Sequence, residues 1–192
     1  MSKKIFYFAL IAIVIAGMST VTSCKKGEND PFLSLRSRKA RITGEWKLSQ
    51  GTITSSFTSG SLSGSSTQIY TGSTCTSDGN TYSYSENLTI KKDGTYEVVI
   101  VDDGFVYTVK GLWFFAGKIK DLDIKNKEAV VFSEQQYNES GYSETYKGLY
   151  GGDVMIIDQL KNKEIIFKGS FSYAGASGST GTDTYDRTFE KL

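Results

Sequence analysis

The chain has 192 residues, with 22 Lys and Arg against 21 Asp and Glu, two cysteines and no histidine. Without histidine, Ser-His-Asp and Cys-His catalysis are excluded and the commonest metal ligand is missing. We therefore expect no enzyme, no metal site and no cofactor. From Ile42 onward there are 14 basic and 19 acidic residues, which excludes nucleic acid as a partner because phosphates require a basic surface.

The first 23 residues have the layout of an export signal. Lys3 and Lys4 precede an apolar run from Ile5 to Gly17, and small residues follow it. A membrane-spanning helix needs about 20 apolar residues, and this run has 13. An uncleaved anchor is the weaker alternative, so we predict that residues 1–23 are a signal peptide.

The signal ends in Val21-Thr22-Ser23-Cys24, which resembles the lipobox of bacterial lipoproteins. The resemblance implies that Cys24 is acylated, becomes the N-terminus and anchors the protein in a lipid bilayer. Each buried methylene contributes about 0.8 kcal/mol, so several acyl chains give stable anchoring. An ordinary signal peptide followed by an unmodified thiol is the alternative.

The residue after the cysteine is Lys25. In the Gram-negative lipoproteins that this signal resembles, an Asp at that place tends to retain the protein at the inner membrane. The resemblance therefore implies a lipid-anchored location at the cell outer membrane. Whether the protein faces the periplasm or the cell surface is left open.

Residues 24–42 form a second unit, in which a polar tether follows the cysteine. Asp30-Pro31 has the sequence of an N-cap followed by proline at the first helical position, which predicts a short helix through about Arg41. Phe32 and Leu35 would share one face of it. The helix either closes the end of a barrel or lies on a membrane surface.

Residues 43–192 alternate between short β-rich runs and turn residues, which is typical of a sandwich or barrel. Asp93-Gly94 and Asp103-Gly104 predict hairpin turns, so consecutive strands form an antiparallel meander. Candidate strands lie near 44–57, 66–76, 80–91, 95–101, 105–115, 118–124, 128–137, 143–149, 154–159, 164–173 and 183–191.

Some of these runs must merge, which leaves about eight to ten strands, and such a meander must close or stack to protect its edges. We predict an all-β, up-and-down antiparallel barrel with a short N-terminal helix, and we expect a monomer. The Ser- and Thr-rich stretch from Thr52 to Ser85 forms either long strands or a loop. Within it, Cys75 is expected to be a buried small hydrophobe rather than a reactive thiol.

The segment Gly44-Glu45-Trp46-Lys47-Leu48 follows the predicted helix, and here the sequence resembles the lipocalin-like domains of bacterial envelope lipoproteins. In lipocalins a Gly-x-Trp places its indole across the closed end of the barrel. The resemblance implies that Trp46 does so and that Arg187, on the last strand, covers it as a cation. No long helix precedes the last strand, unlike in full lipocalins, so the architecture transfers better than the ligand.

Few acidic residues are close in sequence. Asp121 and Asp123 would share a strand face and suit a weak calcium site, but four lysines surround them, so a solvated face is the better interpretation. Asp102-Asp103-Gly104 is explained by turn chemistry.

Aromatic residues supply apolar rings with polar tips, which line pockets or fill cores. The candidates for ligand contact are Tyr82, Tyr84, Tyr96, Tyr107 and Trp113. The leading hypothesis is a membrane-anchored lipoprotein whose barrel binds or sequesters a small, partly apolar ligand in the cell envelope. The alternatives are a surface module that binds glycan or protein, and a barrel with a filled interior.

Overall fold

A computed structural model describes residues 29–31, 36–120, 123–175 and 178–192. The predictions for the signal peptide, for the acylation of Cys24 and for the shared face of Phe32 and Leu35 lie outside these residues. No helix within the described ranges is both long and apolar enough to cross a membrane.

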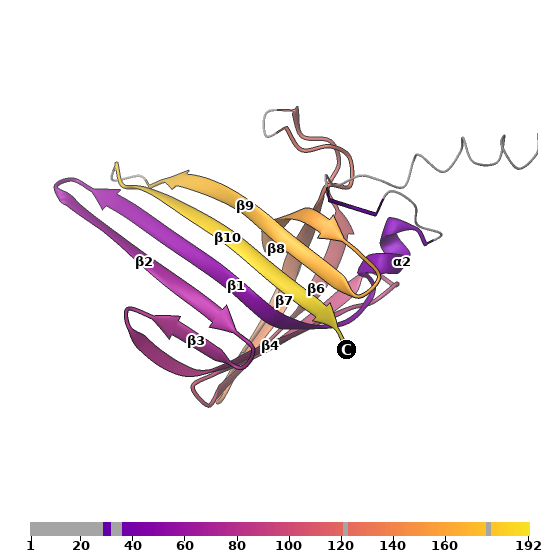
Figure 1. Cartoon of the computed structure of the whole chain (residues 1–192), viewed down its shortest axis with the longest axis horizontal. Coiled ribbons are helices and arrows are strands. Elements are labelled where there is room, and N and C mark those ends of the chain that lie inside the picture. The colour runs from indigo at the N-terminus through magenta and orange to yellow at the C-terminus, as the bar shows by residue number, and fades with distance from the viewer. Residues whose placement is uncertain (1–28, 32–35, 121–122, 176–177) are drawn as a thin grey trace, which may run out of the picture.

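Ten antiparallel strands close into one barrel, which confirms the predicted all-β, up-and-down fold (Figure 1). The order around the barrel is β1-β10-β9-β8-β7-β6-β5-β4-β3-β2, with an additional pairing of β1 with β4. The strands are β1 Gly44–Ser59, β2 Leu62–Thr71, β3 Thr74–Ser77, β4 Asn80–Ile90, β5 Thr95–Asp102, β6 Phe105–Phe115, β7 Ala129–Glu139, β8 Tyr142–Leu160, β9 Glu164–Ala174 and β10 Thr180–Lys191.

Four predicted strand runs differ from the structure. The run 66–76 is divided between β2 and β3, and the runs 143–149 and 154–159 are parts of the single strand β8. The run 118–124 is not a strand, because Ile119 pairs only with Ile124 in an isolated bridge. Ile124 is instead buried with Ala116 and Ala129 in a small apolar cluster beside the barrel.

The Asp103-Gly104 turn has the expected geometry. Asp103 and Gly104 have φ angles of 47° and 88° and join the paired residues Asp102 and Phe105. Two central residues with positive φ are typical of a type I′ hairpin, which matches the twist of its strands. The prediction of turn chemistry for Asp102-Asp103-Gly104 is therefore confirmed.

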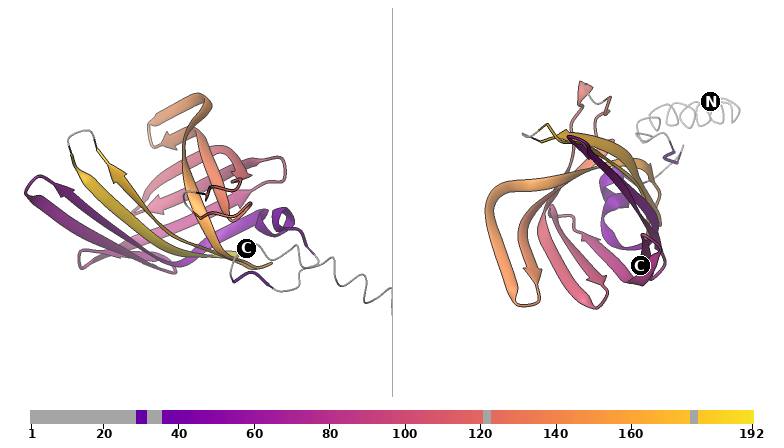
Figure 2. Two further views of the ribbon diagram at one scale, coloured as in Figure 1. Left: turned by 90° about the horizontal axis from the view of Figure 1, so that it is seen from above. Right: turned by 90° about the vertical axis from the view of Figure 1, so that its left-hand side faces the viewer.

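The helix is shorter than predicted and begins later. Helix α2 spans Arg38–Ile42, with Ser37 as its N-cap, whose Oγ accepts from the Ala40 N–H. The predicted cap, Asp30, is wrong because its carboxylate is buried and bound to arginines and to the β8 backbone. In the right-hand view of Figure 2 the helix is seen within the ring of strands, as expected for a segment that closes a barrel.

The two ends of the barrel are built differently. At the closed end β1 pairs with both β4 and β10. Toward the other end, β1, β2, β9 and β10 continue as a long sheet (Figure 1). Strands β8 and β9 are paired only between Ile157–Leu160 and Ile165–Phe167, so among the described residues their ladder ends there. Figure 2 shows β8 turning away from β9 and β10.

Candidate binding cavity

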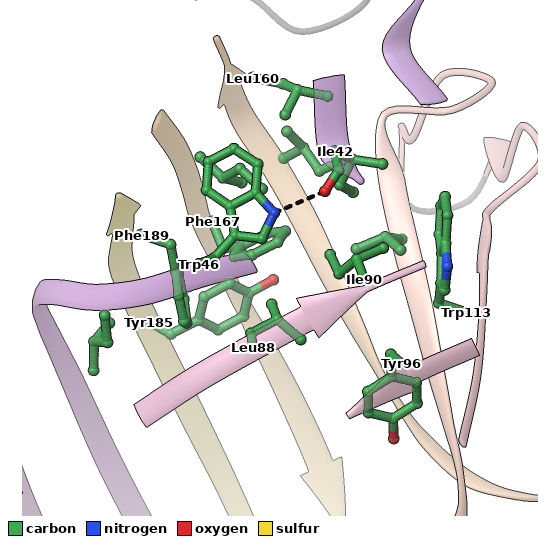
Figure 3. Packing of buried hydrophobic residues seen from close by; sticks show 14 of the residues in the cluster. Ile42, Trp46, Leu88, Ile90, Tyr96, Trp113, Leu160, Phe167, Tyr185 and Phe189 are labelled. Carbon is green, nitrogen blue, oxygen red and sulfur yellow. Dashed lines mark hydrogen bonds between the residues drawn. The ribbon is translucent and has the colours of Figure 1, made fainter. Parts of the chain in front are cut away.

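Trp46 forms the center of the closed end. Its side chain is completely buried, and the indole Nε1 donates a 2.8 Å hydrogen bond to the Ile42 carbonyl of helix α2 (Figure 3). Because a buried indole N–H needs a partner, this bond fixes the ring against the helix. The position of the tryptophan agrees with the role that the lipocalin resemblance implies for Trp46.

The cation over this indole is Lys191 and not Arg187, so the predicted pair of Trp46 with Arg187 is wrong. The Lys191 Nζ lies 4.8 Å from the center of the indole ring and donates to the Thr43 carbonyl. Strand register explains the difference, since Trp46 pairs with Lys191 and Arg187 pairs with Gly51. Trp46 and Gly51 lie five positions apart along β1, at about 3.3 Å per residue, so Arg187 is too far along the barrel to cover the indole.

Gly44 makes the approach of Lys191 possible. Its φ is 145°, and a Cβ at this position would lie 2.5 Å from the Cε of Lys191. This contact explains why the first residue of the Gly-x-Trp segment is glycine, because a larger side chain would displace the lysine from the indole.

A buried ionic cluster ties the N-terminal segment to the closed end. The Asp30 carboxylate accepts a 2.8 Å bond from the Leu160 N–H and pairs with Arg38 at 3.1 Å and Arg41 at 3.3 Å. Arg41 also donates to the Leu160 carbonyl at 2.7 Å. Buried charges require such partners, so the segment at Asp30 is part of the barrel floor.

Above this floor the barrel contains a cavity of about 320 Å³. Most of its wall is apolar, and Phe132, Phe167 and Phe189 provide aromatic surface. The apolar lining is completed by Ile53, Leu88, Val98, Ile100, Val109 and Met155. Ligand pockets are typically about 300–1,000 Å³ and mainly apolar, so this cavity fits a small ligand.

One wall of the cavity carries an ion pair between Arg187 and Glu86, both largely buried. Arg187 also lies over Phe189 and Tyr70, at 5.2 and 5.8 Å from their ring centers. Burial alone would lower the pKa of Arg187, but the Glu86 carboxylate and the nearby tyrosines raise it overall. The pair is therefore charged and internally neutralised.

Two tyrosines support this pair. The Tyr84 hydroxyl donates to Glu86 at 2.8 Å, and the Tyr70 hydroxyl donates to Gln68 at 2.9 Å. Burial raises the pKa of both phenols, and the charge of Glu86 raises the pKa of Tyr84 further. Both hydroxyls therefore stay protonated at neutral pH.

Glu134 and Asp153 line the cavity as well, together with Tyr96. Burial first, and then the charges of Asp153 and Glu144, raise the pKa of Glu134. Burial, followed by the charges of Glu134 and Asp153, raises the pKa of Tyr96. The two carboxylates and the phenol therefore belong to the lining of the same cavity.

Gly111 positions Tyr96. A Cβ on this residue would lie 2.9 Å from the Tyr96 ring and 1.9 Å from the Ser133 carbonyl oxygen. The glycine lies at an irregularity between β6 and β7, where it allows the ring to pass over the strand. Tyr96 then meets Phe132 edge to face, with ring centers 5.0 Å apart.

Of the five predicted ligand contacts, Tyr84 and Tyr96 line the cavity, whereas Tyr82, Tyr107 and Trp113 are not part of its lining. Trp113 is buried at the closed end, where its Nε1 donates to the Lys91 carbonyl at 2.7 Å. The ring of Tyr107 contacts Tyr137, with ring centers 6.4 Å apart.

Tyr82 pairs across the strands with Cys75. Its hydrogen bond to the cysteine, followed by burial, raises the pKa of Tyr82 to about 12. Cys75 itself is completely buried in the core, as expected for a small hydrophobe.

Sequence reasoning missed the polar part of the cavity, which consists of Tyr70, Glu86, Glu134, Asp153 and the inward position of Arg187. A signal was present, because Tyr84, Glu86 and Leu88 alternate on β4 and therefore share one face. Phe132 and Glu134 share a face on β7 in the same way.

No group of three or more metal-ligating side chains occurs among the residues that the structure describes. Asp123 is an exposed residue of the loop before β7, and Asp121 lies outside the described ranges. Since the run 118–124 is not a strand, the strand face that these two aspartates were expected to share does not form.

No protein-family model matches the chain, and no curated protein matches it either. One solved structure is similar, that of Ail, the attachment invasion locus protein of Yersinia pestis, with 7% sequence identity and a TM-score of 0.29. The match covers 78% of this chain and 99% of that chain. At this level of similarity the neighbour carries no argument about function.

Proposed function

We propose that this protein is a non-enzymatic lipoprotein of the outer membrane, anchored through acylated Cys24, whose barrel binds a small amphipathic molecule. The observation that carries the binding function is the cavity of about 320 Å³ above a packed floor. It supports a carrier over a barrel with a filled interior. The lipobox-like signal and the Gly-x-Trp segment support the anchor and the lipocalin-like family.

The apolar lining selects the body of the ligand. Phe132, Phe167 and Phe189 present rings to the cavity, and burial of apolar surface contributes about 25 cal/mol per Å². The charges of Arg187 and Glu86 balance each other, so the pair offers no net charge to the ligand.

Glu134 and Asp153 select the head group. Among the described residues they give the cavity lining an excess of negative charge, because Arg187, the one cation among these residues, is neutralised by Glu86. The neighbouring ring faces attract cations, which adds about 0.5–2 kcal/mol depending on desolvation. A ligand with an apolar body and a cationic head group, such as an amine, fits these walls best.

The test uses the chain that begins at Lys25, with its fold checked by circular dichroism. Isothermal titration calorimetry compares decyltrimethylammonium, decanol and decanoate, which share one chain and differ in head-group charge. We expect the cation to bind most tightly and the carboxylate most weakly. Absence of binding by all three would contradict the carrier function, whereas equal binding would contradict only the head-group preference.

A blocked cavity provides the matched control. Val109 lines the cavity, whereas Val106 on the same strand is 48% exposed. We expect Val109→Trp to abolish binding of the probe and Val106→Trp to leave it unchanged. Equal effects of the two substitutions would place the binding site elsewhere.

The anchor is tested in cells with the two cysteines of the chain. When membranes are washed with 1 M salt, which screens electrostatic binding, Cys24→Ala should move the protein from the membrane fraction to the soluble fraction and abolish incorporation of labelled palmitate. Cys75→Ala, at the buried position of strand β3, is the control and should leave both unchanged. If Cys24→Ala protein stays in the membrane, the lipid anchor is contradicted.

The long sheet of β1, β2, β9 and β10 favours a second candidate function, the recognition of a glycan. Phe57 and Tyr173 are 51% and 48% exposed. Both pair with Gly181 across the sheet, so they share one face with it. Tyr173 lies against Gly181, and Phe57 lies against Gly64, since Cβ atoms there would meet the rings at 2.2 and 2.6 Å.

Exposed rings laid over glycine, with Ser and Thr around them, offer a flat surface on which sugar rings can stack. A glycan array with the soluble chain tests this function, with Phe57→Ser/Tyr173→Ser as the inactive variant. Exposed Phe114 on β6 provides the control Phe114→Ser. Binding that persists in the double variant would exclude the sheet as the site.

A further inference from the structure

Charge is segregated between the two ends of the barrel. Within the described ranges, the connections at the closed end are residues 36–43, 91–94, 116–128 without 121–122, and 161–163. Together they contain 12 Lys and Arg against three Asp and Glu. The described connections at the other end are residues 60–61, 78–79, 103–104, 140–141, 175 and 178–179, and they contain two acidic residues and no Lys or Arg.

The basic connections form one surface. Lys39 of helix α2 lies over Trp113, whose indole binds the Lys91 carbonyl of the next connection. The Lys191 N–H, at the end of β10, donates to the Lys163 carbonyl in the turn between β8 and β9. We call this surface, made by the four closed-end connections, the basic end.

The lysines of the basic end are accessible. The side chains at Lys91, Lys92, Lys118, Lys120, Lys161 and Lys163 are all exposed. Arg38 and Arg41 are paired with buried Asp30, and Lys161 is paired with Glu164 at 2.9 Å, whereas the other exposed lysines of this end face solvent. A positive field therefore reaches solvent from this end of the molecule.

We infer that the basic end is a docking surface for a membrane that carries anionic phospholipid head groups. A basic residue near such a surface contributes about fivefold to partitioning, and the attraction decays within a Debye length. Because the lysines lie on four connections around one end, a planar partner meets many of them at once.

The position of the N-terminal segment agrees with a membrane as the partner. Asn29 is held at the same end, where its side chain donates 3.0 Å bonds to the Asp158 carboxylate. Only four residues lie between Cys24 and Asn29, and the five Cα–Cα steps that join them reach at most about 18 Å. An anchor at Cys24 would thus keep the basic end within reach of the bilayer.

Co-sedimentation tests the inference with the chain that begins at Gly27, which lacks Cys24, Lys25 and Lys26. The core cluster of this chain lies between Ile42 and Phe189, and cooperative thermal unfolding verifies the fold. We expect binding to phosphatidylcholine vesicles that contain phosphatidylglycerol and none to pure phosphatidylcholine. Raising the salt from 0.1 to 1 M shortens the Debye length from about 10 to about 3 Å and should release the protein.

Matched charge removals complete the test. Lys92→Gln/Lys163→Gln, at two exposed lysines of the basic end, should weaken partitioning about 25-fold. The control Lys110→Gln/Lys168→Gln removes exposed lysines outside the four connections and should change it less than about twofold. Equal losses in the two variants, or equal binding to neutral vesicles, would overturn the inference. Since this chain lacks Cys24 and the probe is a vesicle, such a failure leaves the tests of the anchor and of the cavity intact.

Discussion

The closed floor and the cavity of this barrel contain similar types of residue in different roles. At the floor, Trp46 and Arg41 are almost completely buried, and each has a backbone carbonyl as a partner. In the cavity, Glu134 and Asp153 line a space that no described side chain fills. The comparison shows that aromatic and charged residues stabilise the fold where their partners are internal, and are available to a ligand where partners are missing.

The largest expected effect is at the center of the floor. Trp46→Ala removes a buried indole and its bond to Ile42, and should lower the free energy of unfolding by about 4 kcal/mol. Denaturant titration followed by circular dichroism measures it. Phe57→Ala, which truncates an exposed ring of the long sheet, is the control and should cost less than about 1 kcal/mol. A small loss for Trp46→Ala would contradict the importance of the floor.

The next effect concerns the buried ions. Asp30→Asn leaves Arg38 and Arg41 without their carboxylate, and breaking a buried pair costs about 3 kcal/mol. The same titration checks this value, and Asp158→Asn, at the partly exposed partner of Asn29, should cost about 1 kcal/mol. If the two substitutions cost the same, Asp30 is not the structural center of the N-terminal segment.

The cavity should respond to pH in its ligand binding. Because the pKa of Glu134 is raised by burial and by Asp153 and Glu144, this residue gains a proton before an ordinary glutamate does. Affinity for decyltrimethylammonium should fall as the pH falls through this raised pKa. Glu134→Gln should bind about tenfold more weakly at neutral pH and should lose this pH dependence, whereas Glu139→Gln should behave as the unaltered protein does.

The same proton has a defined effect on stability. The folded chain holds it more tightly than the unfolded chain, so the free energy of unfolding should decrease as the pH rises from the ordinary glutamate value through the raised pKa of Glu134. Thermal unfolding across this range measures the slope. An identical slope in Glu134→Gln would assign it to other groups.

The smallest effect lies at the seam between β8 and β9. The Tyr185 hydroxyl of β10 accepts a 2.9 Å bond from the Ile156 N–H of β8, and its ring passes over Gly169 of β9. Tyr185→Phe should therefore lower the free energy of unfolding by about 1 kcal/mol. Tyr142→Phe, whose hydroxyl meets only an exposed glutamate in the described structure, should change it less.

Local chemistry made much of the fold predictable. The Asp-Gly turns and the alternating runs specify hairpins through φ angles and side-chain period, and Gly44 and Trp46 specify the floor. That Lys191 rather than Arg187 lies over the indole was not predictable in this way. The register of β10 on β1 determines which cation reaches the ring.

The cavity was predictable only in part for a related reason. Alternation places Tyr84 and Tyr96 on the inner face, but it does not distinguish a ring that lines a space from one that fills the core. Trp113 shows the difference, since it belongs to the buried cluster and binds a backbone carbonyl of the neighbouring turn.

The short ladder between β8 and β9 has a kinetic consequence. A molecule leaving the cavity along this seam would have to separate Tyr185 from β8, whereas the backbone bonds between Ile157 and Phe167 at the floor would remain. Exchange of the ligand is then independent of global unfolding. Changes at the seam should therefore alter how long a ligand stays bound more than how tightly the barrel is folded.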